Sequence, residues 1–107
     1  MSYRVILNER AEAQLESAYL WWREHRSAEE ATRWYNGFLD CLNGLRENPD
    51  RCGLARENPK FPCSVHELLY GLGSRTTHRA LFTIRHDIVF VFSIRHVAQR
   101  DVSPDDL

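Results

Sequence analysis

The chain has 107 residues, of which 43% are hydrophobic and 27% are charged, and its formal net charge at pH 7 is −1. These values are typical of one soluble domain, and we expect residues 1–107 to fold as one. No apolar run reaches the roughly 18 residues of a membrane span, and the first residues lack the layout of a signal peptide, so the sequence predicts a cytoplasmic protein without membrane contact. The near-neutral charge excludes a global positive field that would attract nucleic acid.

The sequence predicts no metal ion and no cofactor. Its three cysteines, Cys41, Cys52 and Cys63, are an odd number in a chain expected in the cytoplasm, which argues against a disulfide framework. It contains no C-x-x-C pair, no H-E-x-x-H motif and no Gly-rich phosphate loop.

The first half predicts a strand followed by two helices. Residues 3–7, YRVIL, are a short strand, and Asn8 caps a first helix that runs to about His25. Ser27 and Glu30 form a capping box for a second helix, which the Asn-Pro pair at 48–49 ends. Because only one or two residues separate the helices, we expect an antiparallel hairpin.

In the second half of the sequence, apolar residues recur at every second position, as is typical of strands. Strands are predicted at 64–70, 77–84 and 88–96, with a tight loop between the last two and a polar tail that frays from about residue 99. The element order predicts an α+β domain, in which an N-terminal strand, a helical hairpin and a three-stranded antiparallel meander form one twisted sheet.

The last two strands contain the tripeptide Ile-Arg-His twice, at 84–86 and at 94–96. A three-residue loop at 85–87 places Phe82 opposite Phe90 and Arg79 opposite Ser93. The first copy then lies in the loop, about 30 Å from the second, so the two copies cannot share one site. In this register the face toward the helices carries the even-numbered apolar residues Ala80, Phe82, Ile84, Ile88, Phe90, Phe92 and Ile94.

The second copy marks the candidate site. Arg79 and Arg95 share the face away from the helices, which we expect to be partly open, while His78 and His96 are diagonal neighbours on the helix side. Two arginines can bind a phosphate or an acidic peptide, and a histidine can move a proton near neutral pH. Alternatively, the arginines only cover a solvent face and the histidines only bond the main chain.

Three further side chains have open roles. Glu67, on the neighbouring strand, is either a general base or a salt-bridge partner for an arginine. Trp22 belongs to the apolar face of the first helix, whereas Trp21 lies off that face and is a candidate for an interface.

Together these segments resemble the RelE/ParE toxin superfamily over residue 2 to about residue 100. The resemblance is carried by YRVIL, ERAEAQL, the Asn-Pro helix stop, HELLYG, THRALFTI and VFVFSIRHVAQ, in that order. These small toxins of type II toxin–antitoxin modules, often labelled plasmid stabilisation proteins, arrest growth. The resemblance implies a helical hairpin on a twisted sheet and a cognate antitoxin that wraps the toxin in a hetero-oligomer.

The superfamily has two main activities. RelE-like members cleave mRNA on the ribosome, using basic residues on the sheet, an arginine in a YRxxY-like strand and usually a C-terminal tyrosine. ParE-like members lack that set and poison DNA gyrase. Arg79 matches the arginine of the YRxxY-like strand, and His96 matches a histidine common near the end of the last strand. However, no tyrosine follows Tyr70, and the middle strand reads HEL where RelE-like enzymes carry basic residues.

This incomplete set favours a toxin that inhibits DNA gyrase by binding, without chemistry of its own. One alternative is a ribosome-dependent mRNA endonuclease, in which Arg79 and Arg95 neutralise a phosphate and His96 or His78 transfers a proton. Another is an inactive member that binds its antitoxin and regulates its operon. In every case we expect a basic or amphipathic antitoxin, which docks on an exposed strand edge and on the helical hairpin.

Overall fold

The structure is a computed structural model that describes residues 2–106. It confirms the predicted α+β class and the predicted order of elements. In chain order, the strands and α-helices are β1 (Arg4–Leu7), α1 (Glu9–His25), α2 (Ala28–Asn43), β2 (His66–Tyr70), β3 (His78–Arg85) and β4 (Ile88–His96).

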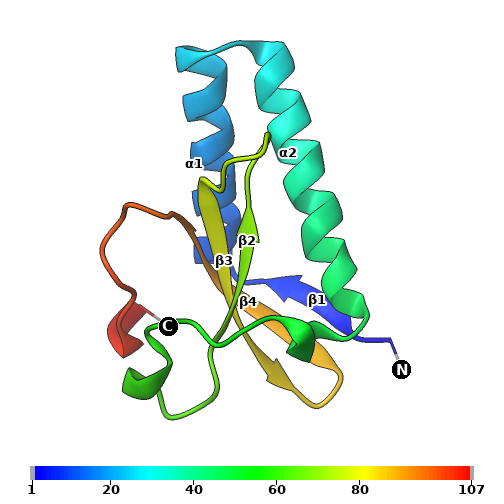
Figure 1. The fold of residues 1–107 in the computed structure, drawn as a ribbon, viewed down its shortest axis with the longest axis vertical. Helices are drawn as coiled ribbons and strands as arrows, with labels where there is room; N and C mark the ends of the chain where they lie inside the picture. Colours follow the sequence, from blue (N-terminus) through cyan, green and yellow to red (C-terminus); the bar gives the residue numbers. More distant parts are fainter. Residues whose placement is uncertain (1, 107) are drawn as a thin grey trace.

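Helices α1 and α2 form a hairpin that packs on one face of the sheet and extends beyond its end (Figure 1). Both predicted N-caps are confirmed. The side chain of Asn8 accepts a hydrogen bond from the Ala11 amide at 2.8 Å, and that of Ser27 accepts one from the Glu30 amide at 3.0 Å. Each bond satisfies an amide that has no partner inside the helix.

Helix α2 ends at Asn43, earlier than predicted. Residues 44–46 continue it as a tighter 3-10 turn, which begins at Gly44, a residue with a low helix propensity. The Asn-Pro pair then turns the chain away, with Asn48 in the left-handed region at a φ of 50°.

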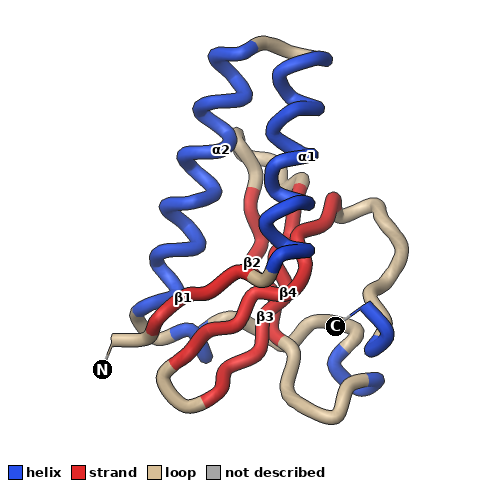
Figure 2. Tube along the Cα trace, turned by 180° about the vertical axis from the view of Figure 1, so that it is seen from behind, coloured by secondary structure: helices blue, strands red, loops and turns tan. Residues whose placement is uncertain are grey.

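The sheet has the order β1-β4-β3-β2. Strands β2, β3 and β4 form the predicted antiparallel meander, and β1 lies parallel to β4 at one edge, so the sheet is mixed (Figure 2). Strand β1 pairs only with residues 88–91 of β4. The later residues of β4 therefore have no strand beside them on that edge.

The predicted register between β3 and β4 is wrong. Arg85 pairs with Ile88 across a two-residue turn, in which His86 has a φ of 56°. On its own, this register would turn every β4 side chain to the sheet face opposite to the predicted one. A bulge at Phe92 shifts the pairing by one residue, so the β4 residues after the bulge return to their predicted faces. Phe82 consequently pairs with Val91, and Arg79 pairs directly with Arg95.

The bulge divides the apolar residues of β4 between two clusters. Val89, Val91 and Ile94 join the helix-side core, in which Trp34 and Phe38 of α2 are fully buried. Phe90 and Phe92 were predicted to face the helices but pack in a second cluster. The buried members of this second cluster are Ala55, Phe61, Val65, Leu81, Phe92 and Val102.

The second cluster covers the sheet face that we expected to be partly open. The loop between α2 and β2 and the tail after β4 come together there, as Figure 1 shows. The tail was predicted to fray, but Val102 is fully buried because it packs in this cluster. Among the described residues, no helix is long and apolar enough to cross a membrane.

Candidate functional site

The four candidate residues lie together at one end of β3 and β4, but on two faces of the sheet. Arg79 pairs directly with Arg95, and His78 pairs directly with His96. The arginines lie beneath the loop and the tail, whereas the rings of His78 and Trp34 lie 4.9 Å apart on the helix side. The two pairs are therefore separate features with separate neighbours.

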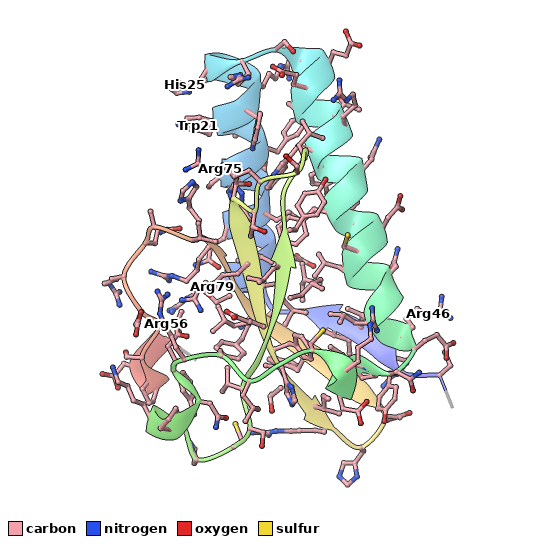
Figure 3. All side chains as sticks on the ribbon, viewed as in Figure 1. Trp21, His25, Arg46, Arg56, Arg75 and Arg79 are labelled. Carbon is pink, nitrogen blue, oxygen red and sulfur yellow. The ribbon has the colours of Figure 1, made fainter. Side chains whose placement is uncertain are left out.

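Arg79 is buried in an ion-pair cluster. Its side chain is 2% exposed, and both terminal nitrogens bond the carboxylate of Glu57, which is fully buried. Its Nη1 also donates to Glu67 at 3.2 Å. This confirms the salt-bridge interpretation of Glu67 and excludes the predicted open position of Arg79 (Figure 3).

The cluster also fastens the C-terminal tail. The amide of Val102 donates to the Glu57 carboxylate at 3.0 Å, so one side chain joins the loop, β3 and the tail. Burial alone would raise the pKa of Glu57, but the hydrogen bonds from Arg79 and Val102 lower it to about 2. The hydrogen bonds that Arg79 donates to Glu57 also raise the pKa of Arg79 above its usual value. Both groups are charged at neutral pH, and each one neutralises the other.

Sequence reasoning missed Glu57 altogether. It lies in a loop that has no periodic pattern, 22 residues before its partner Arg79. Arg95 was also expected on an open face, but it is only 7% exposed. A single sequence contains no signal that pairs a loop carboxylate with a strand arginine, so only the fold shows this contact.

The histidine pair lies between the core and an open groove. The rings of His78 and His96 are 5.3 Å apart, and Thr77 Oγ1 lies 2.9 Å from His78 Nδ1. Burial, with a smaller contribution from His96, lowers the pKa of His78 to about 4. His78 is therefore neutral at physiological pH, whereas His96 is exposed to solvent.

We call the hollow beside this pair the basic groove, and its volume is about 700 Å³. It runs between α1 and the ends of β3 and β4. No carboxylate lines it among residues 2–106. The side chains that give it its character are Arg10, Trp21, Trp22, Arg26, His78 and His96.

A second hollow, the acidic groove, is lined by α1, α2 and β1, and of the elements described only α1 lines both grooves. It measures about 880 Å³ and is lined mostly by apolar and aromatic side chains. Its lining contains no arginine, lysine or histidine in the described part of the chain. The side chains used to define it are Ile6, Glu12, Glu16, Tyr19, Leu20 and Leu39.

The free edge of β1 borders the acidic groove. Strand β1 is the first strand of the sheet, and within the described chain it has a neighbouring strand only on the β4 side. Ile6 is 37% exposed and Leu20 is 44% exposed, so apolar surface continues from the strand edge onto α1. This combination of an open strand edge and an apolar helix surface is typical of a docking site for a peptide.

Comparisons with known proteins agree with this architecture. The family model described as ParE toxin of type II toxin-antitoxin system, parDE, matches residues 5–101. No curated protein matches the chain. A solved structure, the chromosomal ParDE TA system from P. aeruginosa, is similar with a TM-score of 0.71 at 18% identity, over 90% of this chain and 97% of that one. The structural likeness supports the fold, and the match to the family model, which spans nearly the whole chain, shows that this chain belongs to the ParE toxin family of type II toxin–antitoxin systems.

Proposed function

We propose that this ParE-family toxin arrests growth by binding DNA gyrase, without catalysing a reaction itself. The observation that carries this proposal is the burial of Arg79. This residue matches the arginine that RelE-like nucleases use, but here both of its terminal nitrogens are bound to Glu57. A guanidinium held in this way is neutralised and shielded from an RNA phosphate.

The sheet face itself supports the same conclusion. A nuclease needs this face open, so that cationic side chains can follow the RNA backbone. Here the loop, the tail and the second apolar cluster cover it. Ser93 and Thr83, which point to this face between the arginines and the turn, are 1% and 4% exposed.

We further propose that the chain is neutralised by a cognate antitoxin, which binds in the acidic groove. A basic or amphipathic segment suits this groove, because Glu12 and Glu16 are its charged groups and apolar side chains form the rest. The free edge of β1 offers main-chain hydrogen bonds to an extended part of the same segment.

The test is inducible expression of the chain, alone and together with the product of the neighbouring gene. We expect growth arrest, loss of negative supercoiling in a reporter plasmid and DNA damage signalling, all reversed by co-expression. In vitro, the purified chain should inhibit supercoiling by purified gyrase. Arrest of translation before any change in supercoiling would contradict the proposal, and harmless expression would favour an inactive, regulatory member.

One observation keeps mRNA cleavage as a second candidate. His78 and His96 lie next to each other at the edge of the basic groove, where one could accept a proton while the other donates one. Primer extension on translated mRNA would then show new cuts that His96→Ala abolishes. His96 suits this test because it is exposed, whereas substitution of the buried Arg79 would change the fold as well.

A further inference from the structure

The basic groove is separate from the acidic groove and opposite to it in charge. The ionisable side chains that line it are all basic in the described part of the chain, whereas the chain as a whole has a net charge of −1. Two of them, Arg10 and Arg26, are arginines, whose planar guanidinium suits carboxylate recognition. The positive charge is therefore a local property of this groove, and its ligand should be negatively charged.

An exposed but well-held tryptophan lies on the wall of the groove. Trp21 is 51% exposed and points away from α2, as Figure 3 shows. Its ring stacks on His25, with centroids 4.7 Å apart and planes at 14°, and the edge of Trp22 meets it at 5.9 Å. Because these rings already fix its position, Trp21 can cover a partner at little cost in side-chain entropy.

Arg26 lies at the same end of the helix and is available to a partner. Its guanidinium carbon is 5.7 Å from the centre of the Trp22 ring, and its Nε is 3.4 Å from the Glu30 carboxylate. The Arg26 side chain is 56% exposed, and an exposed ion pair of this kind is weak. A carboxylate from another molecule can therefore compete with Glu30 for this arginine.

The strand next to the groove does not accept another strand at this point. Beyond the end of β1, the amide of Ile94 in β4 donates to the side chain of Gln14 at 2.8 Å. This amide, which an added strand would need, is already bonded to α1. A partner in the basic groove must therefore bind through its side chains, in contrast to a partner at the free edge of β1.

We propose that the basic groove binds an acidic peptide segment of the protein that the toxin inhibits. In this assignment an aromatic or aliphatic side chain of the segment packs on Trp21, and its carboxylates bind Arg26 and Arg10. The assignment rests on the proposed function, because it takes the occupant to be the inhibited protein. The antitoxin binds in the acidic groove, which is lined by α1, α2 and β1.

The lining of the groove favours a peptide over RNA. RNA binding requires several cations along a backbone path, but among the described residues only two arginines line this groove, and His78 is neutral at physiological pH. The half-buried ring of Trp22 adds apolar surface that suits a hydrophobic side chain.

The first test uses the full chain and a capped synthetic peptide of aspartate and glutamate residues around a central phenylalanine. NMR spectra of the tryptophan indoles report where the peptide binds. We expect the largest shift at Trp21 and binding roughly tenfold weaker in Trp21→Ala and in Arg26→Glu. Arg33→Glu is the matched control, because Arg33 is also an exposed arginine on the hairpin but lies outside both grooves, and it should bind as the wild type does.

Three results would overturn the assignment. The first is that the wild type, Trp21→Ala and Arg26→Glu bind the peptide equally well. The second is that no binding is detected at millimolar peptide. The third is that a lysine-containing peptide or a short single-stranded RNA binds as tightly as the acidic peptide or more tightly. The variants are substitutions of exposed side chains, and circular dichroism and thermal unfolding verify that they fold.

The second test measures binding of the same variants to purified gyrase. Weaker binding by Trp21→Ala and Arg26→Glu, but not by Arg33→Glu, would support both proposals. If the wild type binds gyrase and all variants bind equally, the groove assignment fails and the proposed function stands. If the wild type does not bind gyrase although the acidic peptide binds at Trp21, gyrase is the wrong target and the chemistry of the groove stands.

Discussion

At the scale of single residues, the proposed function depends most on the contact between Arg79 and Glu57. The side chain of Arg79 matches a functional position of the nuclease branch, yet here it connects a loop, a strand and the tail. These contacts support a structural role for Arg79.

This role predicts a large effect on stability when one partner is removed. Arg79→Met should lower the free energy of unfolding by about 3–5 kcal/mol, because it leaves the Glu57 carboxylate buried without its partner. The matched control is Arg56→Ala, which removes an ion pair with Asp101 between the loop and the tail. Both of those side chains are largely exposed, so the control should cost about 0–1 kcal/mol.

Urea denaturation of the two variants and the wild type measures the difference. The double variant Glu57→Gln/Arg79→Met should regain part of the loss, because it removes the uncompensated charge. Equal effects of Arg79→Met and Arg56→Ala would contradict the structural role of Arg79.

The other residue-scale prediction concerns His78. Burial lowers its pKa from 6.5 to about 4, so the unfolded chain binds a proton more readily than the native chain does. The contribution of His78 to the free energy of unfolding is therefore fully present above pH 6.5 and is lost as the pH falls toward 4. At 1.36 kcal/mol per pKa unit, the free energy of unfolding should fall by about 3 kcal/mol over this range through His78 alone.

His78→Gln checks this dependence, because glutamine is polar but does not titrate. We expect this variant to be less stable than the wild type at neutral pH, since it loses the ring contacts with Trp34 and His96. Its stability should nevertheless fall less steeply between pH 6.5 and 4 in urea denaturation. Parallel curves for the two proteins would show that His78 does not cause the loss.

At the scale of elements, much of the fold could be predicted from local signals. The caps at Asn8 and Ser27 and the apolar periodicity located both helices, because a helix is determined largely by residues near in sequence. The register of β3 and β4 could not be predicted in the same way. It depends on a two-residue turn and on the bulge at Phe92, and the alternation of apolar residues is compatible with more than one register.

The candidate site was predictable only in part for the same reason. The sequence located His78, Arg79, Arg95 and His96 at one end of the sheet, which follows from strand order. The burial of the arginines depends on a loop and a tail that meet over the sheet, and contacts between irregular segments have no periodic signal. The basic groove could not be predicted either, because residues of α1 and β4, which are far apart in the sequence, form it together.

The close packing of α2 against β2 predicts that no larger residue fits at Gly37 without a loss of stability. A methyl group on Gly37 of α2 would lie 2.2 Å from the hydroxyl oxygen of Tyr70 in β2. That hydroxyl donates a hydrogen bond to the Trp34 carbonyl at 3.1 Å. Gly37→Ala should therefore destabilise the protein by about 1–3 kcal/mol through overpacking, although alanine is the better helix former.

A double-mutant cycle tests this fit. Tyr70→Phe removes the hydroxyl oxygen and should cost about 1 kcal/mol on its own, through the lost hydrogen bond. The double variant Gly37→Ala/Tyr70→Phe should lose less stability than the two single variants lose together, because the closest contact of the new methyl group is gone. Strictly additive losses in thermal or urea unfolding would show that Gly37 and Tyr70 do not restrict each other.

At the scale of the whole molecule, α1 borders two grooves of opposite charge. In the proposed function the toxin binds two proteins, its target and its antitoxin, and two different surfaces allow each to be recognised by its own chemistry. Neighbouring residues of α1 illustrate the division, because Leu20 lines the acidic groove and Trp21 lines the basic one. Both side chains are about half exposed, so they form a closely matched pair of probes.

The division predicts that the two interactions can be separated by mutation. Glu16→Lys and Leu20→Ala should weaken binding of the antitoxin by roughly tenfold, because they remove charge complementarity and apolar contact in the acidic groove. Trp21→Ala should instead reduce growth inhibition, while the antitoxin still copurifies with it. Calorimetric titration of each purified variant with the antitoxin, and growth curves after induction, measure the two effects. Loss of both interactions in every variant would mean that target and antitoxin compete for one continuous surface around α1, and the assignment of separate grooves would then be wrong.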